Sequence, residues 1–269
     1  MKRESIDMSG GIVFYWSSGI IDSMRDTVFF MHGMTADHTM FEKQIDAFKG
    51  EFNLILWDAP AHGESRPYKG FSFSDAVDCI TRILDEKRID KVILVGQSLG
   101  GYFAQAFIRN HPERVKGFVS IGSTPFGIKY YSKLDKWILS QIEWMAKLYP
   151  LKAMKKAIAK QVSITQAAYD NMLKMLEPYG KNELCHLMGL GYSAFLNENC
   201  DLQISCPVLL TVGEQDKTGK VKSYNKQWAE DTGFPLIQIP NAAHNANVDN
   251  PDFVNDCILS FIHKLNELN

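Results

Sequence analysis

Short runs of apolar residues recur along the chain, and each run ends at turn-forming residues. The run at 12–21 is interrupted by Ser17, Ser18 and Gly19, which predicts a hairpin. The other runs are continuously apolar rather than alternating, which is typical of strands buried on both faces of a parallel sheet. We predict strands at 27–31, 53–57, 91–95, 115–121, 207–212 and 235–239.

Stretches with the apolar spacing of amphipathic helices lie between these runs. The spacing predicts helices over 72–88, with Ser74 as the candidate N-cap, over 101–110, and from Pro251 towards the C-terminus. Because strands and helices alternate, we expect an α/β fold with a mostly parallel, doubly wound sheet and helices on both faces.

One segment departs from this alternation. Residues 126–203 show no strand pattern, but helical patterns at 132–149, 151–161, 164–177 and 182–196. We predict a core of residues 1–125 and 204–269, and a helical cap (lid) of residues 126–203 over the C-terminal edge of the sheet. Extra helices on the outside of the core are the alternative.

Composition narrows the class of partner. The net charge is -2, with 45% apolar and 22% charged residues, as in ordinary globular proteins. We therefore expect neither nucleic acid nor a membrane surface as a partner. Five cysteines without a C-x-x-C pair predict neither a disulfide framework nor a zinc site, and no signal-peptide or membrane-spanning pattern is found. We expect a cytoplasmic protein and leave its oligomeric state open.

Candidate chemistry lies where the predicted strands end, because open α/β sheets bind ligands beyond the carboxyl ends of their strands. The segment Gly96-Gln97-Ser98-Leu99-Gly100 follows one strand and precedes a helix. This context predicts a nucleophile elbow, in which a sharp, strained turn exposes the Ser98 hydroxyl. The alternative is a glycine-rich turn that caps a helix.

A serine hydroxyl needs a base, and that base needs a carboxylate to orient it. His244 lies in the loop after the last predicted strand, and Asp216 follows the strand before it. We predict a triad of Ser98, Asp216 and His244, with Glu214 as the competing acid. For His244 alone, a solvated loop residue is the alternative, but the order Ser, Asp, His fits the elbow.

Acyl transfer also needs hydrogen-bond donors for the oxyanion. We expect these to be the backbone N–H groups of Leu99, directly after the serine, and of Met34, in the loop after the strand at 27–31. The predicted substrate pocket, apolar in character, contains His32, Trp137, Trp144, Met145 and Met172.

Five segments taken in order resemble the α/β-hydrolase superfamily, in its small cap-bearing serine esterase and hydrolase branch. They are FFMHGMTADHTMF, LWDAPAHGES, LVGQSLGGYFAQAF, TVGEQD and AAHN. The resemblance implies an eight-stranded, mostly parallel sheet, with the cap inserted after the sixth strand. It also implies catalysis through an acyl-enzyme, without a metal or organic cofactor. Asp58 matches a turn residue that we expect to be structural.

Departures from that superfamily's patterns narrow the function. Ser98 argues against its dehalogenases and epoxide hydrolases, which carry aspartate at the elbow. Tyr102 replaces the arginine of the menaquinone-pathway lyase, and Leu99 replaces the tryptophan usual in iminopeptidases. We predict a carboxylesterase-like enzyme with a small-molecule acyl substrate. Hydrolysis of a C–C bond, lactone or thioester is the alternative, followed by a ligand receptor without turnover.

Overall fold

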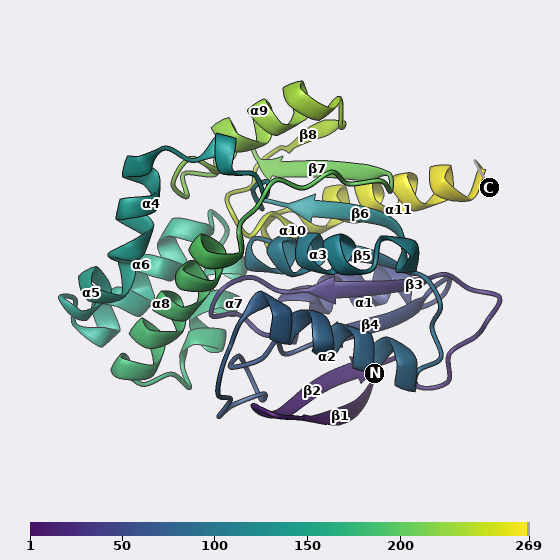
Figure 1. Cartoon of the computed structure of the whole chain (residues 1–269), viewed down its shortest axis with the longest axis horizontal. Coiled ribbons are helices and arrows are strands. Elements are labelled where there is room, and N and C mark those ends of the chain that lie inside the picture. Colours follow the sequence, from purple (N-terminus) through teal and green to yellow (C-terminus); the bar gives the residue numbers. More distant parts are fainter. Residues whose placement is uncertain (268–269) are drawn as a thin grey trace.

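The computed structural model describes residues 1–267, and its centre is an eight-stranded sheet (Figure 1). The strand order is β1-β2-β4-β3-β5-β6-β7-β8. β2 pairs antiparallel with β1 and β4, whereas all other neighbours are parallel, as the apolar runs predict. The strands are β1 (Lys2–Met8), β2 (Gly11–Ser17), β3 (Thr27–Met31), β4 (Asn53–Trp57), β5 (Val92–Gln97), β6 (Val115–Ile121), β7 (Val208–Gly213) and β8 (Leu236–Ile239).

Helices cover both faces of the sheet. α2, α3 and α9 contribute to the hydrophobic core on one face, and α1, α10 and α11 to the core on the other. The bounds of the elements outside the β6–β7 connection are η1 (His38–Phe41), α1 (Glu42–Phe48), α2 (Phe73–Glu86), α3 (Leu99–Asn110), η2 (Pro112–Arg114), α9 (Val221–Thr232), α10 (Ala246–Asp249) and α11 (Pro251–Glu267).

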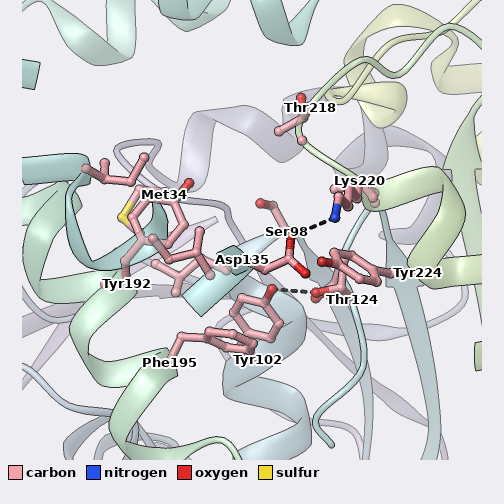
Figure 2. A pocket seen from close by; sticks show the side chains of 18 of the residues that line it. Met34, Ser98, Tyr102, Thr124, Asp135, Tyr192, Phe195, Thr218, Lys220 and Tyr224 are labelled. Atoms are coloured by element: carbon pink, nitrogen blue, oxygen red, sulfur yellow. Dashed lines mark hydrogen bonds and ion pairs between the residues drawn. The ribbon is translucent and has the colours of Figure 1, made fainter. Parts of the chain in front are cut away.

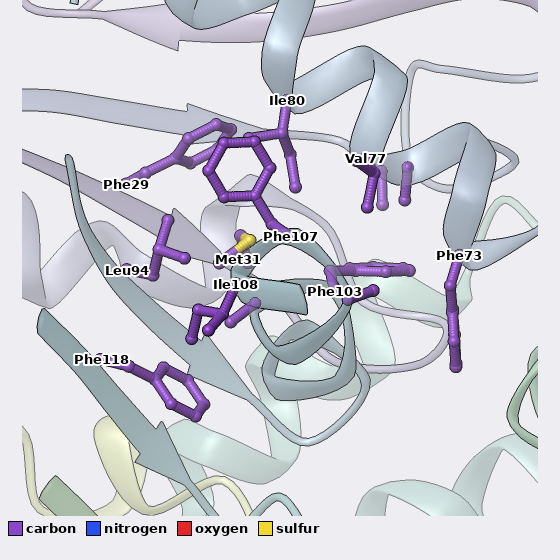
Figure 3. Close-up of a cluster of buried hydrophobic side chains, with 14 of the residues drawn as sticks. Phe29, Met31, Phe73, Val77, Ile80, Leu94, Phe103, Phe107, Ile108 and Phe118 are labelled. Carbon is purple, nitrogen blue, oxygen red and sulfur yellow. The ribbon is translucent and has the colours of Figure 1, made fainter. Parts of the chain in front are cut away.

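The continuous apolar runs are explained by burial on both faces. In β3, Phe29 belongs to the core on the α3 side, while its neighbour Phe30 belongs to the core on the α11 side. Neither side chain is exposed to solvent. Figure 3 shows the first of these cores, where Phe103 of α3 and Ile80 of α2 lie over the sheet.

Two sequence predictions about local structure are wrong. The hairpin lies one strand earlier than expected: β1 pairs with β2 so that Met8 faces Gly11, and the turn lies between them. Residues 18 and 19 instead leave the sheet, with the Ser18 N–H donating to the Leu54 carbonyl at 3.0 Å. The edge position of β1 explains the miss, because its mostly exposed residues lack a continuous apolar run.

The second correction concerns the N-cap of α2. The cap is Ser72, whose hydroxyl accepts a hydrogen bond from the Asp75 N–H at 2.9 Å, rather than Ser74. Ser72 has the extended backbone of a cap residue, whereas Ser74 already lies inside the helix.

A helical group lies between β6 and β7, where the sequence predicts an insertion. In Figure 1 the arrowheads of β3, β6 and β7 point towards this group, so it lies at the carboxyl edge of the sheet. The pattern at 132–149 divides into two helices at Gln141. Its elements are η3 (Ile128–Tyr130), α4 (Lys133–Ser140), α5 (Ile142–Lys147), α6 (Leu151–Val162), α7 (Gln166–Leu176) and α8 (Lys181–Glu198).

The division into a core of residues 1–125 and 204–269 and a cap of residues 126–203 stays a prediction. Within residues 1–267, every helix is too short or too polar to cross a membrane.

Candidate active site

Ser98 lies in the sharp turn between β5 and α3. Its backbone angles are φ 50° and ψ −114°, a region that non-glycine residues rarely adopt. A Cβ on Gly96 would lie 2.5 Å from the carbonyl carbon of Gly100, and a Cβ on Gly100 would lie 1.9 Å from the Met31 oxygen. Glycine is therefore required on both sides of Ser98, because the turn crosses itself and the end of β3.

The structure brings His244 and Asp216 together. The distance between His244 Nδ1 and Asp216 Oδ2 is 2.7 Å, and both residues are buried. Asp216 follows β7 and His244 follows β8, so two neighbouring strand ends supply the pair. Glu214, the competing acid, is exposed at the surface of the same loop.

The charge of Asp216 determines the tautomer of His244. Burial is the largest single effect on Asp216 and raises its pKa, but the hydrogen bond from His244, the charge of His244 and the Thr218 N–H at 2.8 Å together outweigh it. The net effect lowers the pKa of Asp216 below its ordinary value, so the carboxylate is ionised at neutral pH. An ionised carboxylate only accepts hydrogen bonds, so His244 Nδ1 donates and the lone pair of the neutral ring lies on Nε2.

Ser98 and His244 both line two cavities, which meet at this point. We call them the aromatic cavity, of about 380 Å³, and the methionine cavity, of about 360 Å³. Met34, Tyr192 and Thr218 also line both. In Figure 2, Ser98 is seen among the residues that surround the aromatic cavity.

The two cavities differ in their walls. The aromatic cavity has tyrosines and an ion pair in its wall, whereas the methionine cavity is largely aliphatic. Residues found only in the first include Tyr102, Thr124, Tyr131, Asp135, Phe195, Lys220 and Tyr224. Residues found only in the second include Met40, Ile158, Val162, Met172 and Met188.

The loops that carry Met34 and His244 both contact the elbow. A Cβ on Gly33 would lie 2.1 Å from Gln97 Oε1 and 3.2 Å from Ser98 Cβ, so this glycine lets the Met34 loop approach. On the other side, Gln97 Nε2 donates to the His244 carbonyl at 3.1 Å. Met34 and Leu99 consequently both lie in the wall of the aromatic cavity, beside Ser98.

The structure includes one of the expected pocket side chains and excludes the others from the two cavities. Met172 lines the methionine cavity. Trp137, Trp144 and Met145 are 62%, 62% and 41% exposed and line neither cavity. Their expected place in the pocket is therefore corrected: they lie on the outer face of α4 and α5.

His32 is likewise corrected, because it is fully buried and absent from the lining of both cavities. Its Nδ1 donates to the Gly33 carbonyl at 2.8 Å, and its Nε2 accepts the Ala59 N–H at 3.0 Å. Burial lowers the pKa of His32, which keeps the ring neutral. The ring therefore holds the Met34 loop against the end of β4.

One group of metal-ligating side chain types is close together within residues 1–267. It consists of Asp37, His38 and Asp58. Hydrogen bonds already occupy its carboxylates: Asp58 accepts from the backbone N–H and Nδ1 of His38, both at 2.8 Å, and Asp37 accepts from the Thr39 N–H at 2.9 Å. The Asp58–His38 bonds join the segments that follow β4 and β3, which agrees with the structural role expected for Asp58.

The sequence analysis did not identify several residues that surround the Asp216–His244 pair. Gly122, after β6, has φ +58°, and a Cβ there would lie 3.3 Å from His244 Nδ1. Tyr102, Thr124 and Tyr131 form a chain of hydroxyl groups in the aromatic cavity. Tyr102 was detectable from its place directly after the elbow glycines, and Thr124 from its place after a strand.

We expect Gly122→Ala to lower kcat/KM by about tenfold. The new methyl group presses on the His244 ring and moves it by a few tenths of an ångström, and misplacement of a reacting group on this scale is costly. The measurement is steady-state hydrolysis of a short p-nitrophenyl ester.

Gly233→Ala is the matched control for this substitution. Gly233 also has a positive φ, of +76°, but a Cβ there meets nothing within 4 Å. Both variants carry backbone strain, whereas only Gly122→Ala touches the histidine. Equal activities of the two variants would contradict the expected contact effect.

Comparisons with known proteins agree with this architecture. Residues 26–251 match the family model described as alpha/beta hydrolase fold. The chain is 27% identical over 262 residues to pimeloyl-[acyl-carrier protein] methyl ester esterase of Wigglesworthia glossinidia brevipalpis, covering 94% of this chain and 99% of that protein. It is 24% identical over 246 residues to 2-(acetamidomethylene)succinate hydrolase of Mesorhizobium japonicum, covering 87% and 86%.

Solved structures show the same fold at lower identity. A thermophilic esterase from Thermogutta terrifontis has a TM-score of 0.80 at 19% identity, with 98% of this chain and 99% of that chain covered. The enol-lactonase from Burkholderia xenovorans LB400 has a TM-score of 0.75 at 16% identity, with 97% and 100% covered. At these identities the likeness shows the fold alone.

Proposed function

This chain belongs to the α/β-hydrolase fold family and is an enzyme of the hydrolase class, and we propose that it hydrolyses small carboxylic esters through Ser98, His244 and Asp216. One observation carries the proposal. His244 is held by Asp216 at 2.7 Å, with its ring in the wall of the same two cavities as Ser98. The curated relatives named as an ester esterase and as a hydrolase support the reaction class.

In the first half of the reaction, Ser98 Oγ attacks the ester carbonyl carbon and His244 Nε2 takes the hydroxyl proton. Asp216 stabilises the imidazolium that forms. The backbone N–H groups of Met34 and Leu99 stabilise the negative oxygen of the tetrahedral intermediate. His244 then gives the proton to the leaving alcohol, and the acyl group stays on Ser98.

In the second half, water attacks the acyl-enzyme while His244 takes one of its protons. The tetrahedral intermediate collapses, the proton returns to Ser98 Oγ, and the carboxylic acid leaves. Because Ser98 lies where the two cavities meet, the acyl and alcohol parts occupy one cavity each. The two cavities together are large enough for a small ester.

A fluorophosphonate probe tests the proposal without knowledge of the substrate. We expect Ser98 Oγ to displace fluoride and form a P–O bond, which mass spectrometry locates on the peptide that contains Ser98. The Ser98→Ala and His244→Ala proteins are the controls, and neither should be labelled at an appreciable rate. Labelling at another residue, or equal labelling of the His244→Ala protein, would contradict the assigned roles.

A further inference from the structure

Three hydroxyl groups form a continuous hydrogen-bonded chain in the wall of the aromatic cavity. The Tyr102 and Thr124 hydroxyl oxygens are 2.6 Å apart, and so are those of Thr124 and Tyr131. Tyr131 in turn donates to the backbone carbonyl of Pro125 at 2.7 Å. Figure 2 shows the Tyr102 hydroxyl directed at Thr124.

The carbonyl at the end of this chain fixes the direction of every bond in it. A carbonyl oxygen can only accept, so the one proton of Tyr131 is used on Pro125. Tyr131 must then accept from Thr124, whose only proton is thereby used, and Thr124 must accept from Tyr102. Tyr102 therefore has no proton left for a ligand, and its oxygen offers the cavity a lone pair alone.

The hydroxyls of this chain remain protonated at physiological pH. Burial raises the pKa of Tyr102 and of Tyr131 well above the ordinary value of tyrosine. All three residues line the aromatic cavity. Ionisation therefore does not change the direction of the chain.

Another hydroxyl of this wall, that of Tyr224, already has a partner. The Tyr224 hydroxyl is hydrogen-bonded to the carboxyl of Asp135, and burial together with this bond raises the pKa of Tyr224 to about 12. Asp135 is ionised, since Lys220 lies 2.7 Å away and helps to hold its pKa low. Tyr224 therefore donates to Asp135. Lys220 supplies donors, but its side chain is 59% exposed.

A further buried group lacks a partner in the same cavity. Ser123 is 2% exposed, lines the aromatic cavity, and its hydroxyl makes no hydrogen bond within the described residues. Leaving a buried hydroxyl unpaired is costly. The lone pair of Tyr102 is the group for which a ligand hydroxyl, as a donor, is required.

We propose that the aromatic cavity selects esters whose acyl or alcohol part carries a hydroxyl group, which donates its proton to the Tyr102 oxygen. The proposal rests on the proposed ester hydrolysis and adds the class of substrate. A ketone or ether oxygen at the same place would meet the lone pair of Tyr102 and be repelled. Tyr131 acts as a positioning residue, because it sets the direction of the chain.

The test compares hydroxyl and ketone esters that share one carbon skeleton. In the first pair, which are methyl esters, the hydroxyl or ketone group is on the penultimate carbon of a six-carbon acyl chain. In the second pair, which are butyrate esters, it is on the penultimate carbon of a five-carbon alcohol. We expect wild-type kcat/KM to favour the hydroxyl member by about tenfold in one of the two pairs, the equivalent of one hydrogen bond.

Tyr131→Phe is the decisive variant, because it removes the proton that fixes the chain but keeps the ring. The Thr124 proton is then free to bond to Pro125 or Tyr102, and Tyr102 can donate into the cavity. We expect the hydroxyl-to-ketone ratio to fall to about one. Thr124→Val breaks the chain one step closer to Tyr102 and should have the same effect, so the test does not depend on one variant folding.

Tyr130→Phe is the matched control. It makes the same chemical change one residue away, at a tyrosine that is outside the lining of the aromatic cavity. The wild-type ratio should persist in this variant. Two results would overturn the proposal. The first is a hydroxyl-to-ketone ratio of kcat/KM near one for both ester pairs in the wild type. The second is a ratio that stays at its wild-type value in both Tyr131→Phe and Thr124→Val.

Binding to the Ser98→Ala protein separates this proposal from the proposed reaction. Calorimetry with the same esters needs no turnover. Tighter binding of the hydroxyl member, lost on adding Tyr131→Phe, supports the selection even if the wild type hydrolyses neither ester. Equal binding of both members overturns it even if both are hydrolysed.

Discussion

Ser98→Ala is expected to lower kcat for a short p-nitrophenyl ester by about 10⁵-fold. The substitution removes only the attacking oxygen, so the acyl-enzyme cannot form. The residual rate comes from substrate binding and from the oxyanion donors, which alanine leaves in place. Because alanine keeps the Cβ that the strained turn already accommodates, the free energy of unfolding should change by less than about 1 kcal/mol.

The control for this experiment is Ser140→Ala, the same change at an exposed position at the end of α4. Its kcat should equal that of the wild type. Circular dichroism and thermal unfolding of both variants would check that the fold is intact. Retention by the Ser98→Ala protein of more than a hundredth of the wild-type kcat would rule out Ser98 as the nucleophile.

Asp216→Asn is expected to have the second largest effect, a loss of kcat of about 10⁴-fold. The wild-type carboxylate only accepts, so it holds the Nδ1–H of His244 and leaves the lone pair on Nε2. An asparagine amide can donate to Nδ1 instead, which places the proton on Nε2. That tautomer cannot take the proton of Ser98.

Glu214→Gln is the matched control for Asp216→Asn. Glu214 lies two residues earlier in the same loop, and its side chain is exposed. Steady-state kinetics at neutral pH should give a kcat within about twofold of the wild type. If the large loss followed Glu214→Gln and not Asp216→Asn, the acid would have been assigned to the wrong residue.

The predicted pocket shows why helix faces are difficult to choose from sequence. Asp135, Ile138, Leu139 and Ile142 have the spacing of one helical face, and these residues line the aromatic cavity. The predicted pocket residues Trp137, Trp144 and Met145 lie on other positions of α4 and α5, and they are 62%, 62% and 41% exposed. Apolar character favoured the second set in the sequence analysis, although the first set lines the aromatic cavity beside Ser98.

Other differences between the predicted and the observed structure also arise because a local sequence pattern does not show tertiary contacts. β1 lies at the edge of the sheet, where it pairs with β2, and most of its residues are exposed. Its sequence therefore lacks a continuous apolar run. His32 is next to the loop expected to hold the oxyanion donor, and only its two hydrogen bonds reveal a supporting role for the ring. A local pattern contains no information about such contacts.

The sequence by itself determined the α/β class, six of the eight strands, the elbow at Ser98 and the chain order of the candidate triad. These features depend on local physics: burial on both faces gives continuous apolar runs, and a turn that crosses itself requires glycine. Only the tertiary structure decided that Asp216 rather than Glu214 reaches His244, which side chains line the two cavities, and that the hydroxyl chain ends on Pro125. Those features depend on contacts between residues that are distant in the chain or lie on different faces of a helix, and packing of the whole molecule sets them.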